Sequence, residues 1–252
     1  MDETRSTAAI ILSRQPYREN DVLVSAYTGN YGRVSLVARG AKKAGSKLAG
    51  HIEPLTLADL MIIKGRGFDY VGSAITSNSY PVIRNDLNRL YYAGKVVGLF
   101  NRLVKEGQAD KNLFFLLSDW LVAFDGLVEA GRELPKSEGA WYFIFFAWKL
   151  LAILGYEPEV HNCLLCQKKL SPGQNFFSFR DGGLICRDCE HKESYSGSDS
   201  QGHNLLTISD NCVKILRFIF NNDLKVVKKL KLTKGSLEEL TILTNNFINF
   251  HC

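Results

Sequence analysis

Residues 21–39 read DVLVSAYTGNYGRVSLVAR, and this stretch decides the fold of the first part of the chain. Its two halves, 21–28 and 33–39, are rich in residues that favour strands, and the second half alternates polar and apolar side chains. Between them, Gly29-Asn30-Tyr31-Gly32 has the composition of a tight turn. The stretch therefore predicts two neighbouring strands with one face buried.

Similar short strands are expected on both sides of this pair. Residues 8–12 precede it, and residues 55–63 and 69–75 follow it, the last two joined by the turn Lys64-Gly65-Arg66-Gly67. Five short strands with no helix long enough for a crossover predict a small closed antiparallel barrel. The oligonucleotide-binding (OB) fold is the commonest barrel of this kind, so we expect residues 1–80 to form an OB-fold nucleic-acid-binding domain.

After Pro81 the apolar residues recur every three to four positions, which is typical of amphipathic helices. We expect one helix or two in tandem at 87–104, and further helices at 113–128, 140–154, about 209–222 and about 236–250, with Asp110 as a cap before the helix at 113–128. A cysteine-rich insert occupies about 160–192, and a loop of small polar residues follows at 194–204. The chain is therefore expected to be an α+β multidomain protein whose residues 81–252 form an α-helical bundle carrying this insert.

The composition is that of a folded protein. With 46% hydrophobic and 23% charged residues, the chain can fill real cores, which excludes wholesale disorder and a fibrous fold. The most apolar run, 140–154, is shorter than the roughly twenty residues that a bilayer crossing needs. The N-terminus carries acidic residues where a signal peptide needs lysines. We therefore expect a cytoplasmic protein with no membrane partner.

Four of the six cysteines form two C-x-x-C pairs that can meet around one metal ion: Cys163, Cys166, Cys186 and Cys189. Four thiolates complete a tetrahedral shell with no open position, so we expect one structural Zn²⁺ in a zinc ribbon. Gly182-Gly183 suits the hairpin before the second pair, while Gln167 stands where glycine would make the first turn easier. Buried free cysteines and a redox pair are the alternatives, although neither pair opens a helix after a strand as thioredoxin-type pairs do. The nearby histidines are expected to be surface residues: His161, His191 and His203.

The net charge of +5 is mild, but the basic residues are concentrated. Residues 39–47, RGAKKAGSK, combine cations with small residues that let a phosphate backbone approach. The candidate DNA-binding residues are Arg33, Arg39, Lys42, Lys43, Lys47, Lys64 and Arg66. Tyr31 or Phe68 can stack a base. Against this interpretation, a basic loop is usually only a solvated loop, and the two aromatic residues can equally be core or hinge residues.

Several motifs resemble those of one family. In the N-terminal part they are Glu19-Asn20-Asp21, Tyr27-Thr28, Gly32, VARGAKK at 37–43, SKLAG at 46–50 and Glu53-Pro54. In the C-terminal part they are GYEP at 155–158, the four cysteines and GGL at 182–184. Together they resemble the RecO family of bacterial recombination mediators of the RecF pathway, over nearly the whole chain and least after about residue 205.

The resemblance implies an OB-fold, a helical bundle and a zinc ribbon in one protein without enzymatic activity. It implies that the protein binds single- and double-stranded DNA, anneals complementary strands, pairs with RecR, and helps RecA to displace the single-stranded DNA-binding protein. It also implies a place in DNA repair and recombination after DNA damage, in the cytoplasm and associated with the nucleoid. Gln167 departs from the glycine common in the family, and some members lack the cysteines. The Zn²⁺ is therefore expected to support folding rather than DNA chemistry.

Two other classes of function compete with this one. In the first, the protein is a zinc-ribbon scaffold whose barrel binds protein partners and whose basic loop is incidental; the salt dependence of DNA binding discriminates the two. In the second, it is an enzyme, but the sequence contains no Walker loop, no G-x-S-x-G, no H-E-x-x-H and no metal-nuclease acid cluster. Neither catalysis nor a small-molecule substrate is therefore expected. The basic run at 225–234 can contact DNA or the tail of the single-stranded DNA-binding protein, or be a solvated face.

Overall fold

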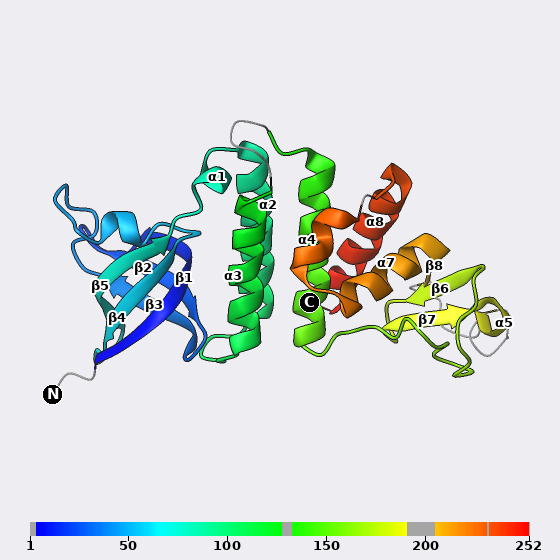
Figure 1. The fold of residues 1–252 in the computed structure, drawn as a ribbon. Helices are drawn as coiled ribbons and strands as arrows, with labels where there is room; N and C mark the ends of the chain where they lie inside the picture. Colours follow the sequence, from blue (N-terminus) through cyan, green and yellow to red (C-terminus); the bar gives the residue numbers. More distant parts are fainter. Residues whose placement is uncertain (1–3, 128–132, 191–204, 231, 252) are drawn as a thin grey trace. The chain divides into compact units, whose positions relative to one another are not determined.

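The computed structural model describes residues 4–127, 133–190, 205–230 and 232–251 (Figure 1). The chain divides into two compact units, residues 1–134 and residues 135–252. The boundary expected at residue 80 lies inside the first unit, so the division into domains at that point stays a prediction. Among the described helices, none is long and apolar enough to span a membrane.

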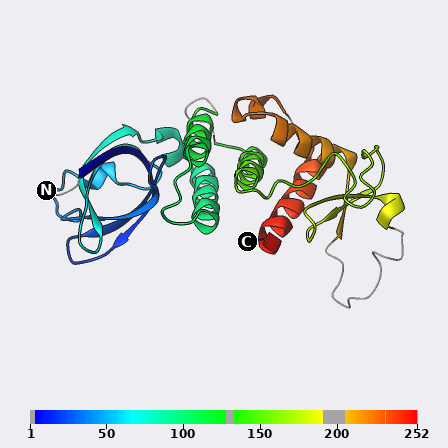
Figure 2. The ribbon, with the colours of Figure 1, turned by 90° about the horizontal axis from the view of Figure 1, so that it is seen from below.

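The first unit begins with a five-stranded closed barrel in the order β1-β2-β3-β5-β4. Its strands are β1 (Thr4–Pro16), β2 (Val22–Thr28), β3 (Gly32–Ala38), β4 (Leu57–Ile63) and β5 (Asp69–Asn78). Figure 2 shows them curving around a common interior. The long strand β1 closes the ring because its first half pairs with β4 and its second half with β2, with an irregularity between Ile11 and Ser13. The five predicted strands are confirmed, and β1 is much longer than expected.

The expectation of a purely antiparallel barrel is wrong at one pair. Strands β3 and β5 are parallel, with Leu36 opposite Asp69 and Val37 opposite Tyr70. The reason is topological: strand direction cannot alternate all the way around a ring with an odd number of strands. Side chains from every strand fill the interior: Ala9, Ile11, Val24, Ala26, Leu36, Ala38, Ala58, Leu60, Ile62, Val71 and Ala74.

The described part of the first unit also contains the 3₁₀ helix η1 (Ala49–His51) and the helices α1 (Pro81–Arg84), α2 (Leu87–Leu103) and α3 (Lys111–Asp125). Asp110 caps α3 as predicted, its side chain accepting a hydrogen bond from the Asn112 backbone N–H at 2.7 Å. Tyr27 of β2 connects the barrel to the segment before α3 through hydrogen bonds. Its hydroxyl donates to the carbonyl oxygens of Gln108 and Asp110, and its ring packs edge-on against Phe100 at 4.8 Å.

The second unit combines helices with a small sheet in the order β7-β6-β8. Its elements are α4 (Lys136–Ile153), β6 (Asn175–Ser178), β7 (Gly183–Cys186), α5 (Arg187–Glu190), β8 (Leu205–Ile208), α7 (Asp210–Asn221), the 3₁₀ helix η2 (Leu224–Lys229) and α8 (Lys234–His251). Trp148 of α4 joins helix and sheet, since its ring contacts Phe177 and Phe247 and its Nε1 donates to Thr244 Oγ1 at 2.9 Å. The predicted helices are confirmed. The polar loop expected at 194–204, with His191 and His203, lies outside the described residues.

Candidate metal centre and nucleic-acid interface

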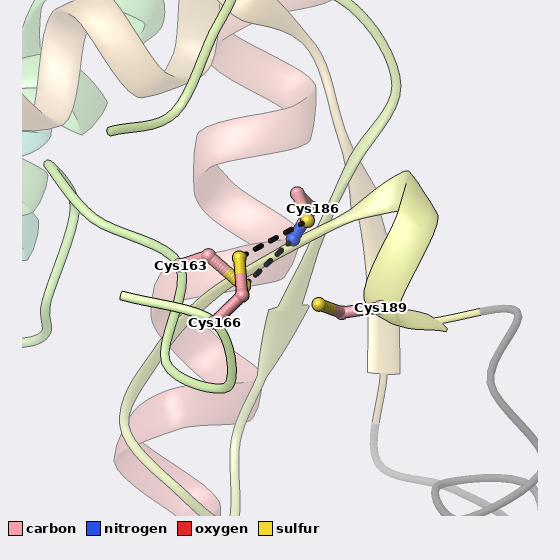
Figure 3. Close-up of side chains that lie close together, drawn as sticks. All are labelled: Cys163, Cys166, Cys186 and Cys189. Atoms are coloured by element: carbon pink, nitrogen blue, oxygen red, sulfur yellow. Dashed lines mark hydrogen bonds between the residues drawn. The ribbon is translucent and has the colours of Figure 1, made fainter. Parts of the chain in front are cut away.

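The four cysteines of the two C-x-x-C pairs meet in the second unit. Cys163 and Cys166 come from the loop before β6, Cys186 ends β7, and Cys189 lies in α5. The expectation that neither pair opens a helix after a strand is therefore wrong for the second pair, although its thiols lie in one cluster with those of the first pair. Figure 3 shows their side chains converging, and the four sulfur atoms lie within 4.8 Å of one another. The Cys166 and Cys186 sulfurs are 3.9 Å apart. Because zinc–sulfur bonds of about 2.3 Å place tetrahedral ligands about 3.8 Å apart, the cluster can hold a metal ion in the way that a structural zinc requires.

Local backbone geometry explains how both pairs reach this point. Gln167 adopts a φ of 60°, the left-handed conformation that glycine tolerates best, and its N–H donates to the Cys163 carbonyl at 2.9 Å. Gly182 also has a positive φ, of 67°. The Leu164 N–H donates to the Leu184 carbonyl at 2.9 Å, which ties the first pair to the strand that delivers the second. The roles expected of Gln167 and of the glycines before Cys186 are confirmed.

The surroundings of the clustered cysteines change the pKa values of their thiols. Burial opposes ionisation of Cys163, but backbone N–H groups of Cys166, Cys186 and Leu165 lower the pKa of this thiol to about 6. Burial, followed by competition among the sulfurs, raises the pKa of the Cys189 thiol to about 12. One thiolate is thus favoured, while burial and the neighbouring sulfurs oppose ionisation of Cys186 and Cys189. A divalent cation bound to the sulfurs would favour the thiolate form of all four.

Replacing Gly183 with alanine is expected to destabilise this unit. A Cβ atom there would lie 2.8 Å from the Glu159 carbonyl oxygen, in the segment that runs beside β7. Since a backbone atom cannot move aside cheaply, we expect a loss of about 1–3 kcal/mol. Gly235→Ala in α8 is the matched control: its Cβ meets nothing within 4 Å, so stability should rise by about 0.5–1 kcal/mol. Denaturant unfolding of both variants measures the two effects, and an unaltered Gly183→Ala protein would contradict the prediction.

Three turns of the barrel gather at one end and carry most of the candidate DNA-binding residues. They are 17–21 between β1 and β2, 39–48 after β3, and 64–68 between β4 and β5. The exposed cations on these turns, which we call the basic end, are Arg18, Arg39, Lys42, Lys43, Lys47, Lys64 and Arg66. Arg18 is the one member that sequence reasoning missed, because nothing in the sequence indicates that the first turn reaches the other two.

Specific contacts hold the three turns together. The Lys42 N–H donates to the Asn20 carbonyl at 3.0 Å, and its Nζ donates to the Arg18 carbonyl at 2.9 Å. The Arg39 guanidinium lies over the Tyr70 ring, 3.8 Å from its centre. The rings of Tyr17 and Phe68 join the first turn to the third at 5.6 Å. The barrel therefore positions Arg39 and Lys42 directly, and the turns that carry the other cations are tied to one another.

The basic end contains few acidic residues, and two of these accept hydrogen bonds from the backbone. The Asp21 carboxylate accepts from the Gly40 N–H at 2.9 Å, and the Asp69 carboxylate at the start of β5 accepts from the Gly65 N–H at 3.1 Å. Glu19 is exposed beside Arg18. Positive charge thus predominates at the basic end, where it is open to a polyanion.

Arg33 and Tyr31 lie elsewhere on the barrel. Arg33 Nη1 donates to the Asn101 carbonyl at 2.7 Å, and a side chain at Gly32 would meet the backbone of Gln108 at 2.4 Å. The segment between α2 and α3 therefore covers the start of β3. Arg33 and Arg39 are six residues apart on an extended chain, or about 20 Å. The structure does not bring Arg33 together with the other candidates, and its contact with DNA stays a prediction.

The basic run at 225–234 is described only in part. Lys225 and Lys228 are exposed, and Lys234 forms an exposed ion pair with Glu238 at 3.9 Å. The side chain of Lys229 and the whole of Lys231 lie outside the described residues. Nothing in this part of the structure assembles the lysines on a shaped surface as the three turns of the barrel do.

Comparison with known proteins agrees with this arrangement of parts. Residues 1–80 match the family model "Recombination protein O N terminal", and residues 84–252 match "Recombination protein O C terminal". Three relatives are each described as "DNA repair protein RecO". The protein of Desulforamulus reducens is 28% identical over 96% of this chain and 88% of its own length. That of Dehalococcoides mccartyi is 31% identical over 97% and 89%, and that of Roseiflexus sp. (strain RS-1) is 32% identical over 98% and 81%. The chain therefore belongs to the RecO family.

Proposed function

We propose that the barrel is an OB-fold and that its basic end binds single- and double-stranded DNA. One observation carries the proposal: three turns of a closed five-stranded barrel hold their cations together by direct contacts. In OB-folds, the loops between the first two and the last two strands are those that bind oligonucleotides, and these are two of the three turns. The cations contact phosphates, so binding is independent of sequence.

The mechanism that follows is electrostatic. Two DNA strands that approach one another repel through their phosphates, and cations that neutralise part of this charge lower the barrier to pairing. The protein therefore promotes annealing of complementary strands without cutting DNA or hydrolysing a nucleotide. The zinc ribbon, with one structural Zn²⁺ held by the four cysteines, stabilises the second unit and takes no chemical step.

The cellular role is proposed from the family. The relatives are described as DNA repair proteins, so we place this protein in DNA repair and recombination. We further propose that it acts with RecR to help RecA load onto DNA coated by the single-stranded DNA-binding protein, at the nucleoid.

The salt dependence of binding tests the proposal. If three to six cations contact phosphates, the slope of log K against log salt for a single strand should lie between about −2 and −4. Titrating a fluorescent oligonucleotide with the protein at several salt concentrations measures this slope. A protein-binding scaffold with an incidental basic loop predicts weak binding at every salt concentration, and that result would overturn the proposal.

A further inference from the structure

We propose that Tyr17 and Phe68 form a stacking platform for unpaired bases, which makes the basic end prefer single-stranded over double-stranded DNA. The inference rests on the proposed DNA binding and adds to it a ligand subsite and a source of discrimination. The two residues lie on different turns, with their ring centres 5.6 Å apart and their planes at 69°. Tyr17 is 38% exposed and Phe68 is 41% exposed, so each offers aromatic surface to a ligand.

Charge surrounds this aromatic surface. The Arg18 guanidinium lies 5.2 Å from the centre of the Tyr17 ring, and Lys64 and Arg66 lie on the same turn as Phe68. Phosphates that follow the cations would bring their bases to the rings. An apolar ring beside several cations is the combination that proteins use to hold single strands, because every base has a face that can stack.

The platform is held in place before any ligand arrives. A Cβ atom at Gly65 would lie 2.0 Å from the Phe68 carbonyl oxygen, so the third turn is wound too tightly for any other residue there. The Tyr17 N–H donates to the Asp21 carbonyl at 3.2 Å, closing the first turn. Because the backbone that presents both rings is already ordered, stacking costs little conformational entropy.

Discrimination follows from what each part can contact. The cations reach phosphates on either form of DNA, whereas the rings need a base whose face is free. In a duplex the base faces are already stacked on one another. Stacking therefore adds affinity for the single strand alone. An annealing protein gains from this, since the duplex product loses the stacking contact and is held less tightly than the substrate strands.

The platform also distinguishes Phe68 from Tyr31, the other aromatic residue that the sequence offered. Tyr31 lies in the turn between β2 and β3, its N–H donates to Thr28 Oγ1 at 3.0 Å, and the Arg5 guanidinium lies 5.2 Å from its ring centre. It is separated from the basic end by the length of β3.

Binding of an oligothymidine strand and of a duplex, at two salt concentrations, tests the inference. Phe68→Ala should weaken single-strand binding by between about 5-fold and about 150-fold, the range found for one stacked base. Duplex binding and the salt slope should stay unchanged, because no cation is lost. Phe68→Trp should restore single-strand binding, and its fluorescence should be quenched by the strand. The native tryptophans Trp120, Trp141 and Trp148 are 0%, 4% and 0% exposed and supply a constant background.

Two further variants distinguish the loss of base stacking from a loss of folding. Phe68→Leu retains the apolar bulk without the ring and should bind as weakly as Phe68→Ala. Tyr91→Ala removes an aromatic residue that is 60% exposed on α2 and should bind like the wild type. Equal loss for strand and duplex, or wild-type binding by Phe68→Leu, would overturn the platform while leaving a steep salt slope and the proposed function intact. A flat slope for the wild type would overturn both.

Discussion

A protein in which Cys186 is replaced by serine is expected to bind no Zn²⁺ at the proposed site and to lose much of the stability of its second unit. The four sulfurs lie within 4.8 Å of one another, and burial and mutual competition already resist ionisation of Cys189. Removing one ligand leaves an incomplete shell, and metal binding that was coupled to folding no longer contributes. We expect a loss of more than about 4 kcal/mol and a fall in Tm of about 10 °C or more.

Metal analysis and thermal unfolding on the same samples measure this effect. A strong chelator should lower the Tm of the wild type toward that of Cys186→Ser and should leave the variant itself unchanged. Cys212→Ala is the matched control, because Cys212 is buried in α7 and is not one of the four clustered cysteines. It should keep one zinc per chain and lose only about 1 kcal/mol for the deleted sulfur. Wild-type protein that contains no metal after growth with ample zinc would contradict the prediction.

Local sequence patterns predicted most strands and helices, because two periodicities were strong: the alternation of polar and apolar residues in strands and the repeat of three to four residues in helices. The alternation in residues 33–39 identified β3, and the turn residues on either side fixed its ends. The cysteine pairs were equally informative, since their spacing constrains four ligands at once. The short strand β8 (Leu205–Ile208) was missed because a four-residue strand at the edge of a polar loop carries almost no pattern. The parallel pair of β3 and β5 was missed because it follows from ring closure and from no local feature.

The DNA-binding surface was predicted less completely, because basic residues that are close together in the sequence need not be close together in the folded protein. Arg33 and Arg39 belong to one basic stretch of sequence, yet the extended strand between them carries Arg33 to the segment before α3. Conversely, Arg18 is distant from Lys42 in sequence, and their turns are joined by a hydrogen bond of 2.9 Å. The contact of Tyr17 with Phe68 likewise depends on two hairpin ends that meet only when the barrel closes.

Replacing Lys42 and Lys43 with alanine is the second change from which we expect a large effect, here on DNA binding. Both side chains are exposed on the turn after β3, and the Lys42 N–H fixes that turn against Asn20. Each lost phosphate contact on a single strand should flatten the salt slope by about 0.7, so the pair should flatten it by about 1.4. At 0.1 M salt this corresponds to a loss of about 25-fold in affinity, which should vanish on extrapolation to 1 M. The factor should be similar for every oligonucleotide sequence, and annealing should slow with it.

A second pair of lysine replacements shows whether the loss of affinity depends on where Lys42 and Lys43 lie or only on the net charge of the protein. Lys168→Ala with Lys169→Ala removes the same charge from exposed residues of the second unit and should leave affinity and slope unchanged. Because both side chains are exposed and only the Lys42 Nζ–Arg18 hydrogen bond is lost, stability should fall by no more than about 1 kcal/mol and zinc content should not change. If the Lys42 and Lys43 variant kept both its melting temperature and its affinity, the strand would have to lie elsewhere. Lys225→Ala with Lys228→Ala would then be the pair expected to flatten the slope, because both lysines are exposed in the basic run at 225–234. The salt slopes of the Lys42 and Lys43 variant and of the Lys225 and Lys228 variant therefore show whether DNA binds to the barrel or to the basic run at 225–234.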